Sequence, residues 1–269
     1  MPDTTASTFR ALHQGSELLL LPNVWDAGSA RLFESLGARA IATTSAGIAW
    51  ALGYPDGDVL PIDRLVATVQ AITGVIRVPL TVDAEGGYSD DPATVGENVA
   101  RLLSEGAVGI NLEDGSGPPE LLAAKIEHVK RASAQRGLDV FVNARTDVFL
   151  RGLVPPERRV EETLARAARY QQAGADGLFV PGATNAADLE ALTRGTRLPV
   201  NAMARPDLPS VPELQRLGVR RLSAGSAIAQ ALWGRAGALA TAFLREGHSA
   251  ALFEEASSYP SLNGLMTRR

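Results

Sequence analysis

Cysteine is absent from this chain, which excludes disulfide bonds, a thiolate nucleophile and any Cys-based metal or redox centre. Lysine occurs only as Lys125 and Lys130, and neither follows a predicted strand, so a Schiff-base aldolase is disfavoured. The histidines, His13, His128 and His248, lie before the first strand, inside a predicted helix and near the C-terminus. This placement argues against a His-ligated zinc site. Carboxylates and arginines are left as the candidates for chemistry.

Long apolar runs and clustered positive charge are also lacking. No uninterrupted apolar stretch reaches the roughly 18 residues of a membrane helix, and the N-terminal residues show no basic and apolar signal pattern. The formal net charge is −4, which disfavours the basic face that nucleic-acid binding requires. We therefore expect a cytoplasmic protein with no nucleic-acid or membrane partner.

What the chain does contain is a series of eight short apolar runs that read as β-strands. They are nearly non-alternating, as expected for parallel strands that are covered on both faces. The runs are Leu18–Leu21, Ala40–Ser45, Pro79–Asp83, Gly109–Glu113, Val140–Arg145, Gly177–Val180, Pro199–Met203 and Arg220–Ala224. The pattern predicts an α/β fold, a (β/α)8 TIM barrel with additional C-terminal helices.

Helical segments lie between these strands, and several carry recognisable start signals. Asp26 is a candidate N-cap for 27–36, and Asp91-Pro92 opens a helix that runs to about Glu105. Further helices are expected at 120–135, 157–173, 188–194, 211–217, 226–245 and 249–255. Because no linker or composition change divides the chain, we predict a single barrel domain over residues 1–269, with 226–269 as a C-terminal helical tail.

Acidic residues follow two neighbouring strands at their carboxyl ends, where the catalytic loops of a barrel meet. Asp83 and Glu85 come after one strand, and Glu113 ends the next. Carboxylate oxygens select a hard cation, so we predict a site for Mg²⁺, with Mn²⁺ possible as a substitute. The alternative is that such acids cap helices or pair with arginines. For the adjacent Asp114 that alternative weighs about as much as a functional role.

Arg145 ends the fifth strand, and its planar guanidinium suits bidentate capture of a carboxylate or an enolate oxygen. An ion pair with Glu113 or Asp83 inside the barrel is the alternative, and the two roles are compatible. Asp147 is expected to orient Arg145 or to hold the loop. We therefore predict that Arg145 and Glu113 act in catalysis.

Three further segments complete the predicted site. The turn Thr44-Ser45-Ala46-Gly47 offers hydroxyls and backbone N–H groups to an anion, although it also reads as a simple small-residue turn. The acidic segment 54–58 could fold over the site, with Asp56 as the base or orienting acid. Trp25 and Asn201 are included as substrate-binding candidates, and rim packing is the alternative for Trp25. Gly225-Ser226 could cradle a phosphate, but it is equally good turn chemistry.

Four segments, taken in their order along the chain, resemble the phosphoenolpyruvate mutase/isocitrate lyase superfamily. The resemblance is specifically to its 2-methylisocitrate lyase and oxaloacetate decarboxylase-like branch. These are 21–31 (LPNVWDAGSAR), 45–56 (SAGIAWALGYPD), 83–88 (DAEGGY), and 112–114 (LED) with 144–147 (ARTD). The resemblance implies a Mg²⁺-binding barrel that stabilises the enolate or oxyanion of a 2-oxo acid. It also implies a homo-oligomer, a dimer or tetramer, formed through the C-terminal helices.

By that resemblance, Asp83, Glu85 and Glu113 are the metal-binding acids and Arg145 grips the substrate. Asp56 is then the acid of a mobile segment, and residues 44–46 form the carboxylate-binding turn. The chain departs from the pattern in three ways. Glu85 stands where Asp is usual, the lyase Cys is missing, and so are the Asn and Lys of the mutase and phosphonate-hydrolase branches.

These observations lead to a Mg²⁺-dependent lyase as the main functional hypothesis. It would cleave a C–C bond adjacent to a 2-oxo or 2-hydroxy carboxylate, with a 2-methylisocitrate- or oxaloacetate-like substrate, through a metal-stabilised enolate. One alternative is a phosphonopyruvate hydrolase or mutase that acts on a P–C bond. Another is a 2-oxo-acid binding protein with little turnover, which the missing Cys motivates. The identity of the proton donor and acceptor stays open.

Overall fold

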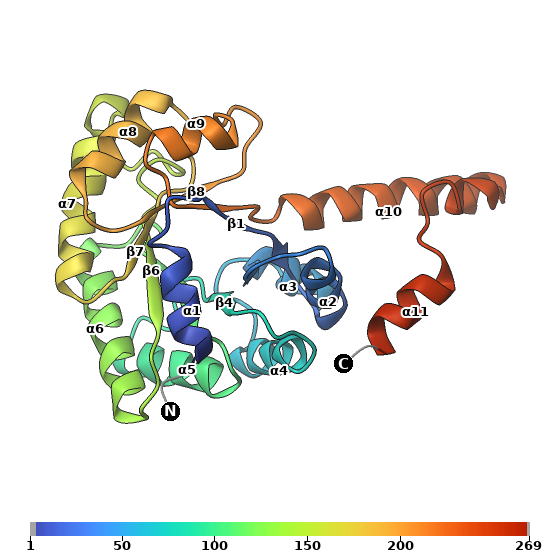
Figure 1. Cartoon of the computed structure of the whole chain (residues 1–269), viewed down its shortest axis with the longest axis horizontal. Coiled ribbons are helices and arrows are strands. Elements are labelled where there is room, and N and C mark those ends of the chain that lie inside the picture. Colours follow the sequence, from blue (N-terminus) through green and yellow to red (C-terminus); the bar gives the residue numbers. More distant parts are fainter. Residues whose placement is uncertain (1–3, 268–269) are drawn as a thin grey trace.

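A computed structural model describes residues 4–267 as a parallel barrel surrounded by helices (Figure 1). The nine strands pair in the order β1-β9-β8-β7-β6-β5-β4-β3-β2, and every pairing is parallel. They are β1 (Leu19–Leu21), β2 (Asn23–Val24), β3 (Ile41–Thr43), β4 (Leu80–Asp83), β5 (Gly109–Glu113), β6 (Phe141–Arg145), β7 (Gly177–Phe179), β8 (Val200–Met203) and β9 (Arg221–Ser223). The predicted (β/α)8 barrel with additional C-terminal helices is confirmed.

The barrel has eight strand positions but nine strands, because Pro22 divides the first strand into β1 and β2. Proline has no backbone N–H and interrupts the ladder there. On one side of Pro22, β1 pairs with the last strand through Leu19 and Arg221. On the other side, β2 pairs with β3 through Asn23 and Ala42. The first barrel position therefore joins the two ends of the strand series and closes the ring.

The helices between the strands begin where local chemistry favours them. Asp26 caps α2 in a capping box with Ser29, and Asp91 caps α5 ahead of Pro92, as predicted. The helices are α1 (Thr4–Leu12), α2 (Ala27–Ser35), α3 (Ser45–Ala51), α4 (Ile62–Thr73), α5 (Pro92–Ser104), α6 (Pro119–Gln135), α7 (Arg159–Gln172), α8 (Ala186–Gly195), α9 (Val211–Arg216), α10 (Ala227–Glu246) and α11 (Tyr259–Thr267). Short 3₁₀ turns lie at Pro156–Arg158 and Ala250–Leu252.

The C-terminal segment corrects one prediction. The helix expected at 249–255 is wrong: only the 3₁₀ turn Ala250–Leu252 forms there, and α11 begins later at Tyr259. Gly247 ends α10 in the left-handed conformation, and the seven residues that were expected to be helical are too few to form a helix without packing. In Figure 1, α10 projects away from the barrel, and α11 turns back toward the barrel. There the Arg31 Nε of α2 donates to the Leu265 carbonyl at 3.3 Å.

The main hydrophobic core lies between the barrel and its covering helices, with residues such as Ile41, Val82, Leu112 and Leu178 fully buried. A second cluster closes the amino end of the barrel, where Phe9 of α1 packs against Phe141. Among residues 4–267, no helix has both the length and the apolarity to cross a lipid bilayer. The core fixes the strands, and their carboxyl ends gather the predicted site residues.

Candidate active site

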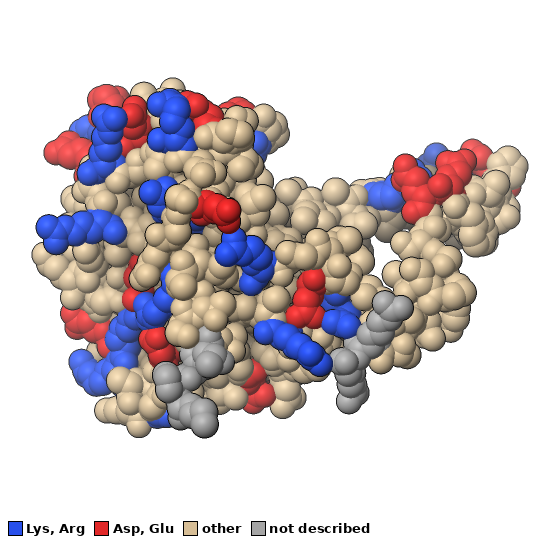
Figure 2. All heavy atoms as spheres, in the orientation of Figure 1, with Lys and Arg blue, Asp and Glu red and all other residues tan. Residues whose placement is uncertain are grey.

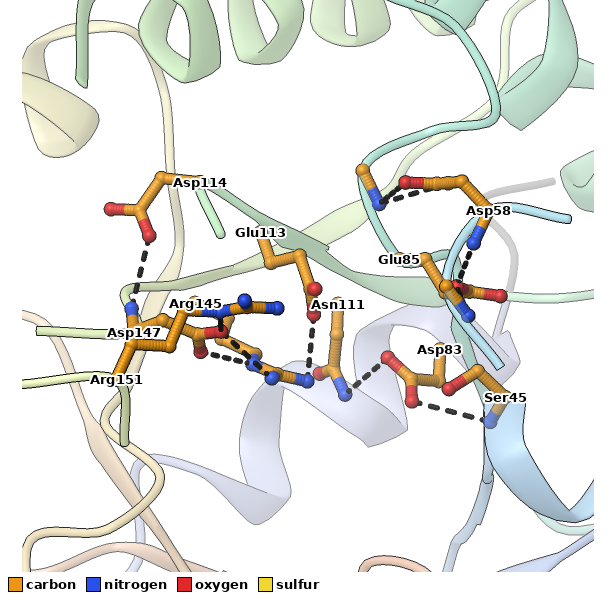
Figure 3. Close-up of polar contacts among 12 residues, drawn as sticks. Ser45, Asp58, Asp83, Glu85, Asn111, Glu113, Asp114, Arg145, Asp147 and Arg151 are labelled. Atoms are coloured by element: carbon orange, nitrogen blue, oxygen red, sulfur yellow. Dashed lines mark hydrogen bonds and ion pairs between the residues drawn. The ribbon is translucent and has the colours of Figure 1, made fainter. Parts of the chain in front are cut away.

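The ends of β4, β5 and β6 bring the predicted acids and Arg145 to one side of the barrel mouth (Figure 3). Strand register places Asp83 beside Asn111, and Glu113 beside Arg145. The Arg145 Nη1 lies 2.6 Å from Glu113 Oε2, and its Nε donates to Asp147 Oδ1 at 2.8 Å. The predicted ion pair is thus present, and Asp147 orients the guanidinium from the other side.

Asp83 connects the acidic strand ends to the predicted anion-binding turn. Its carboxylate accepts from the backbone N–H of Ser45 at 3.3 Å and from the Asn111 amide at 3.5 Å. The turn is the start of helix α3, which Thr44 caps through a hydrogen bond from the Gly47 N–H. Glycine is required at 47 because a Cβ there would lie 2.7 Å from the Thr44 methyl carbon.

Glu85 has a different surrounding from Asp83. Its carboxylate accepts from the backbone N–H groups of Gly57 and Asp58 and from the Tyr88 hydroxyl, the last at 2.8 Å. In return, the Asp58 carboxylate accepts from the N–H groups of Gly86 and Tyr88. These reciprocal bonds tie segment 56–58 to segment 85–88. Glu85 therefore holds the acidic segment in place, and its role as a metal ligand stays a prediction.

A cavity of about 180 Å³ lies at the mouth and collects most of the predicted substrate-binding residues. Thr44, Ser45, Ala46, Asp56, Asp83 and Arg145 all line it. Its remaining walls come from Asn23, Asn111, Leu150, Phe179, Met203, Ser223, Gly225 and Ser226. Glu113 lines a second cavity of about 290 Å³ together with Gly57 and Asp58.

Three predicted substrate-binding residues lie outside the lining of the smaller cavity. Trp25 is partly buried, packs edge-on against Phe33 and lies close to Gly47. Asn201 is buried in the barrel interior, where its amide oxygen accepts from Asn143 and its nitrogen donates to the Ser223 hydroxyl. Gly47 supports the turn from within α3. Direct substrate contact by these three stays a prediction.

Burial and mutual repulsion shift several carboxyl groups of the site toward their neutral forms. Burial raises the pKa of Glu113 to about 8, against the lowering effect of Arg145 and with the added repulsion of Asp83. Burial is also the main cause of the raised pKa values of Asp56 and Glu85. Carboxyl groups that are driven toward their neutral forms indicate a site where an added cation would be stabilising.

Within residues 4–267, no three acidic or histidine side chains converge tightly enough to define a metal cage. Mg²⁺ does not need one, because it retains several waters and binds through one or two carboxylates. Asp83 and Glu113 offer carboxylate oxygens of that kind from adjacent strands, with the Asn111 amide between them in Figure 3. This donor set and the repulsion between neighbouring acids fit a hydrated divalent cation.

Asn111 is the residue that reasoning from the sequence missed. It lies two positions before Glu113 on β5 and lines the cavity beside Asp83. Alternate residues of a strand share one face, so its inward orientation could have been inferred from that of Glu113. Phe179, Met203 and Ser223 also line the cavity and were also missed. They lie on predicted strands, but their side chains are uncharged and did not indicate a site.

Together, the closed parallel barrel and an acid-, amide- and arginine-lined mouth define a (β/α)8 enzyme with an oxygen-rich site. A family model described as phosphoenolpyruvate phosphomutase matches residues 9–244, and the chain belongs to that family. The resemblance drawn from the motifs is confirmed, and the chain is an enzyme of the isocitrate lyase/phosphoenolpyruvate mutase type.

Individual relatives cover most of the chain. An uncharacterized Mycobacterium tuberculosis protein is 39% identical over 223 residues, which is 81% of this chain and 82% of the relative. The oxaloacetate decarboxylase of Paraburkholderia xenovorans is 30% identical over 239 residues, covering 84% and 77% of the two chains. A crystal structure of a Burkholderia cenocepacia protein is 40% identical, with a TM-score of 0.84 over 89% of this chain and all of that one.

Proposed function

We propose that this enzyme is a divalent-metal-dependent lyase that cleaves the C–C bond next to the 2-oxo or 2-hydroxy carboxylate of a small, oxaloacetate-like acid. The observation that carries the proposal is the 180 Å³ cavity in which Asp83, Asn111 and Arg145 face the turn at Ser45. Drug-sized ligands occupy pockets of roughly 300–1,000 Å³, so this volume favours a four-carbon acid over a branched tricarboxylate such as 2-methylisocitrate. The relative named oxaloacetate decarboxylase supports the same substrate class.

Mg²⁺, or Mn²⁺ in its place, would be held by Asp83 and Glu113, with Glu85 reaching it through water. When bound, the cation supplies positive charge where the 2-oxo oxygen becomes negative. The choice of metal rests on the hard oxygen donors, since neither histidine nor cysteine lines the described cavity.

Arg145 and the turn at Ser45 bind the substrate in this proposal. The Arg145 guanidinium is already fixed by Glu113 and Asp147, so little rotamer freedom is lost when it grips a carboxylate. The N–H groups at the start of α3 favour a second negative oxygen, as helix N-termini do. The same groups stabilise the enolate that remains after the bond breaks.

Asp56 is the residue to which we assign proton transfer. It lines the cavity on the segment that Glu85 holds, and burial raises the pKa of its carboxyl group while a hydrogen bond with Ser45 opposes the rise. A carboxyl group whose pKa is raised keeps its proton to a higher pH than an ordinary aspartate does, and it can deliver that proton to the enolate carbon. It would thereby take the role for which this chain has no cysteine.

Cleavage of a P–C bond is the second candidate. Gly225 and Ser226 line the same cavity as Arg145 and could contact a phosphono group opposite the carboxylate turn. The family description, phosphoenolpyruvate phosphomutase, is consistent with that chemistry. A binding protein with little turnover is the third reading, and the missing cysteine is its motivation.

We also propose that two or more copies associate through the C-terminal helices. Helix α10 exposes Leu232, Trp233, Phe243 and Leu244, although water-facing helices are normally polar. On the face that Figure 2 shows, few charged side chains lie on the half of this arm nearest the barrel. A second copy that covers this face would bury it in a dimer or tetramer. The cytoplasmic location stays a prediction.

The test is turnover of a panel of 2-oxo and 2-hydroxy di- and tricarboxylates, plus phosphonopyruvate, followed by mass spectrometry with Mg²⁺ and with EDTA. We expect metal-dependent conversion of an oxaloacetate-like acid that Asp83→Asn abolishes. Asp63→Asn, which changes an exposed acid paired with Arg101, is the matched control. No turnover of any carboxylate would refute the C–C lyase. Phosphate release would support the second candidate, and oxalate binding without turnover, unaffected by Asp56→Asn, would support the third.

A further inference from the structure

Arg221 is a positively charged side chain buried inside the barrel, beneath the site. It begins β9, is 1% exposed, and faces inward with Ser223, whereas Leu222 between them packs toward the outer core. It forms no ion pair with any carboxylate in the described part of the chain. Its Nε and Nη1 atoms also have no hydrogen-bond partner among the protein atoms of residues 4–267.

Such an arrangement is costly for folding. Buried charges are normally paired, and an unpaired one is strongly destabilising. Burial lowers the pKa of Arg221 to about 9, and only the charge of Asp83 acts in the other direction. Arg166 is the contrast within the same molecule: it is also buried, but it pairs with Asp114 and Glu162 at 2.8 and 2.7 Å. An apolar side chain at 221 would suit the fold better, which indicates a functional reason for arginine.

Among the described residues, Arg221 makes one side-chain hydrogen bond, and this bond points to that reason. Its Nη2 donates to the Asn111 amide oxygen at 3.2 Å, and Asn143 donates to the same oxygen at 2.9 Å. An amide can turn over and exchange its oxygen and nitrogen, but a guanidinium only donates. Arg221 therefore requires the Asn111 oxygen to face the barrel interior, which leaves the Asn111 nitrogen to donate to Asp83 Oδ1. Figure 3 shows this amide nitrogen directed at the Asp83 carboxylate.

We propose that Arg221 is a positioning residue of the active site, which acts through Asn111 to orient Asp83. Its positive charge also offsets the negative charge of the acidic mouth, and this favours the binding of an anionic substrate. The proposal rests on the proposed function, because it assumes that the ligand of the cavity is an anionic acid. Arg221 itself does not line the cavity.

A structural role and a positioning role for Arg221 predict opposite effects of its replacement on the melting temperature. Arg221→Met keeps the side-chain length and removes the charge, so we expect a melting temperature that is unchanged or higher by about 2–6 °C. Calorimetry with oxalate and Mg²⁺ should show affinity reduced on the order of tenfold, as for other supporting residues behind a metal site. Arg166→Met, the matched control, should lower the melting temperature because it leaves Asp114 without its cation.

Two further variants separate the contributions. Arg221→Lys retains the charge, so its oxalate affinity should lie closer to wild type than that of Arg221→Met. Asn111→Ala removes the intermediary, and adding Arg221→Met to it should cause less further loss of affinity than in the wild-type background. Additive losses would refute the action through Asn111.

A melting temperature that falls for Arg221→Met as it does for Arg166→Met, or an oxalate affinity equal to wild type, would overturn the proposal. If Arg221→Met does not fold, Arg221→Lys decides. The proposal then stands only if Arg221→Lys folds and binds oxalate less tightly than wild type; otherwise the charge is structural and the proposal is overturned. Failure of the wild-type enzyme to bind oxalate is a different result. It refutes the proposed function, and Arg221 is then judged by the sign of the melting-temperature change alone.

Discussion

Arg145 and Glu113 lie opposite each other in the register of two neighbouring strands, with Nη1 and Oε2 only 2.6 Å apart. The pair holds the guanidinium at the edge of the cavity, where its remaining donors can reach a bound carboxylate. Because lysine retains the charge but lacks the planar fork, an Arg145→Lys change tests geometry rather than charge.

For Arg145→Lys we expect kcat/KM on the best substrate of the panel to fall on the order of 100-fold, with the fold retained. Steady-state kinetics and circular dichroism are the measurements. Arg151→Lys is the control, since Arg151 also binds Asp147 but is half exposed. Equal losses in the two variants would mean that the Asp147 network, rather than substrate capture, explains the effect.

Glu85 is expected to act as the anchor of segment 56–58. Glu85→Ala removes the acceptor of two backbone N–H groups and one hydroxyl, so we expect the free energy of unfolding to fall by about 1.5–3 kcal/mol. Hydrogen exchange should accelerate at the amides of Gly57 and Asp58. Tyr88→Phe, which removes only the hydroxyl, should leave those two amides protected. Unchanged exchange in Glu85→Ala would contradict the anchoring role.

His13 should make the fold sensitive to acid. It donates from Nδ1 to the Phe9 carbonyl and stacks on Phe141, and burial, then the charge of Arg221, lowers its pKa to about 3. The unfolded chain binds a proton near pH 6.5, so the folded state binds fewer protons between about 6.5 and 3. The contribution of neutral His13 to the free energy of unfolding is therefore complete above pH 6.5. It is lost as the pH falls through this window, by up to about 1.4 kcal/mol per pH unit.

Urea unfolding at several pH values measures this slope. His13→Asn keeps a donor for the Phe9 carbonyl and should flatten the dependence between pH 6.5 and 4. The control is His128→Asn, which changes a half-buried helical histidine with the same kind of hydrogen bond to the residue four positions earlier. If the slope of His13→Asn equals that of wild type, the acid sensitivity has another source.

Gly47 should tolerate no side chain. In Gly47→Ala the new Cβ would lie 2.7 Å from Thr44 Cγ2 and 3.1 Å from Trp25 Cβ, so we expect a loss of about 1–3 kcal/mol in the free energy of unfolding. Gly234 in α10 has open space around its position, and Gly234→Ala should instead stabilise by about 0.5–1 kcal/mol. Chemical denaturation of both variants decides; a neutral Gly47→Ala would show that the turn can adjust.

The exposed apolar face of α10 should be required for assembly. Trp233→Arg places a charge on that face, and light scattering coupled to gel filtration should show a smaller species than wild type. Leu36→Glu places a charge directly after α2, at a side chain that is 75% exposed, and should leave the molar mass unchanged. A wild-type protein that is already monomeric at micromolar concentration would refute association through α10.

Much of the barrel could be predicted from local sequence. Apolar runs without alternation marked the buried strands, and Asp26 and Asp91 marked helix starts, because these signals depend on neighbours within one turn or one strand. The seven-residue helix expected at 249–255 failed for the opposite reason: a segment that short gains its stability from packing partners, which the local sequence does not reveal.

The sequence by itself determined that acids and one arginine end neighbouring strands, since strand ends and residue types are both local properties. Only the tertiary structure decided what each of them contacts. The chain leaves β4 after Asp83 and turns through a positive φ of 50° at Glu85, so two acids that are two residues apart have different partners. Closure of the ring likewise brings Arg221 to Asn111 across 110 positions of sequence. Residue spacing along the chain does not record such distances, because they depend on how every strand between the two residues packs.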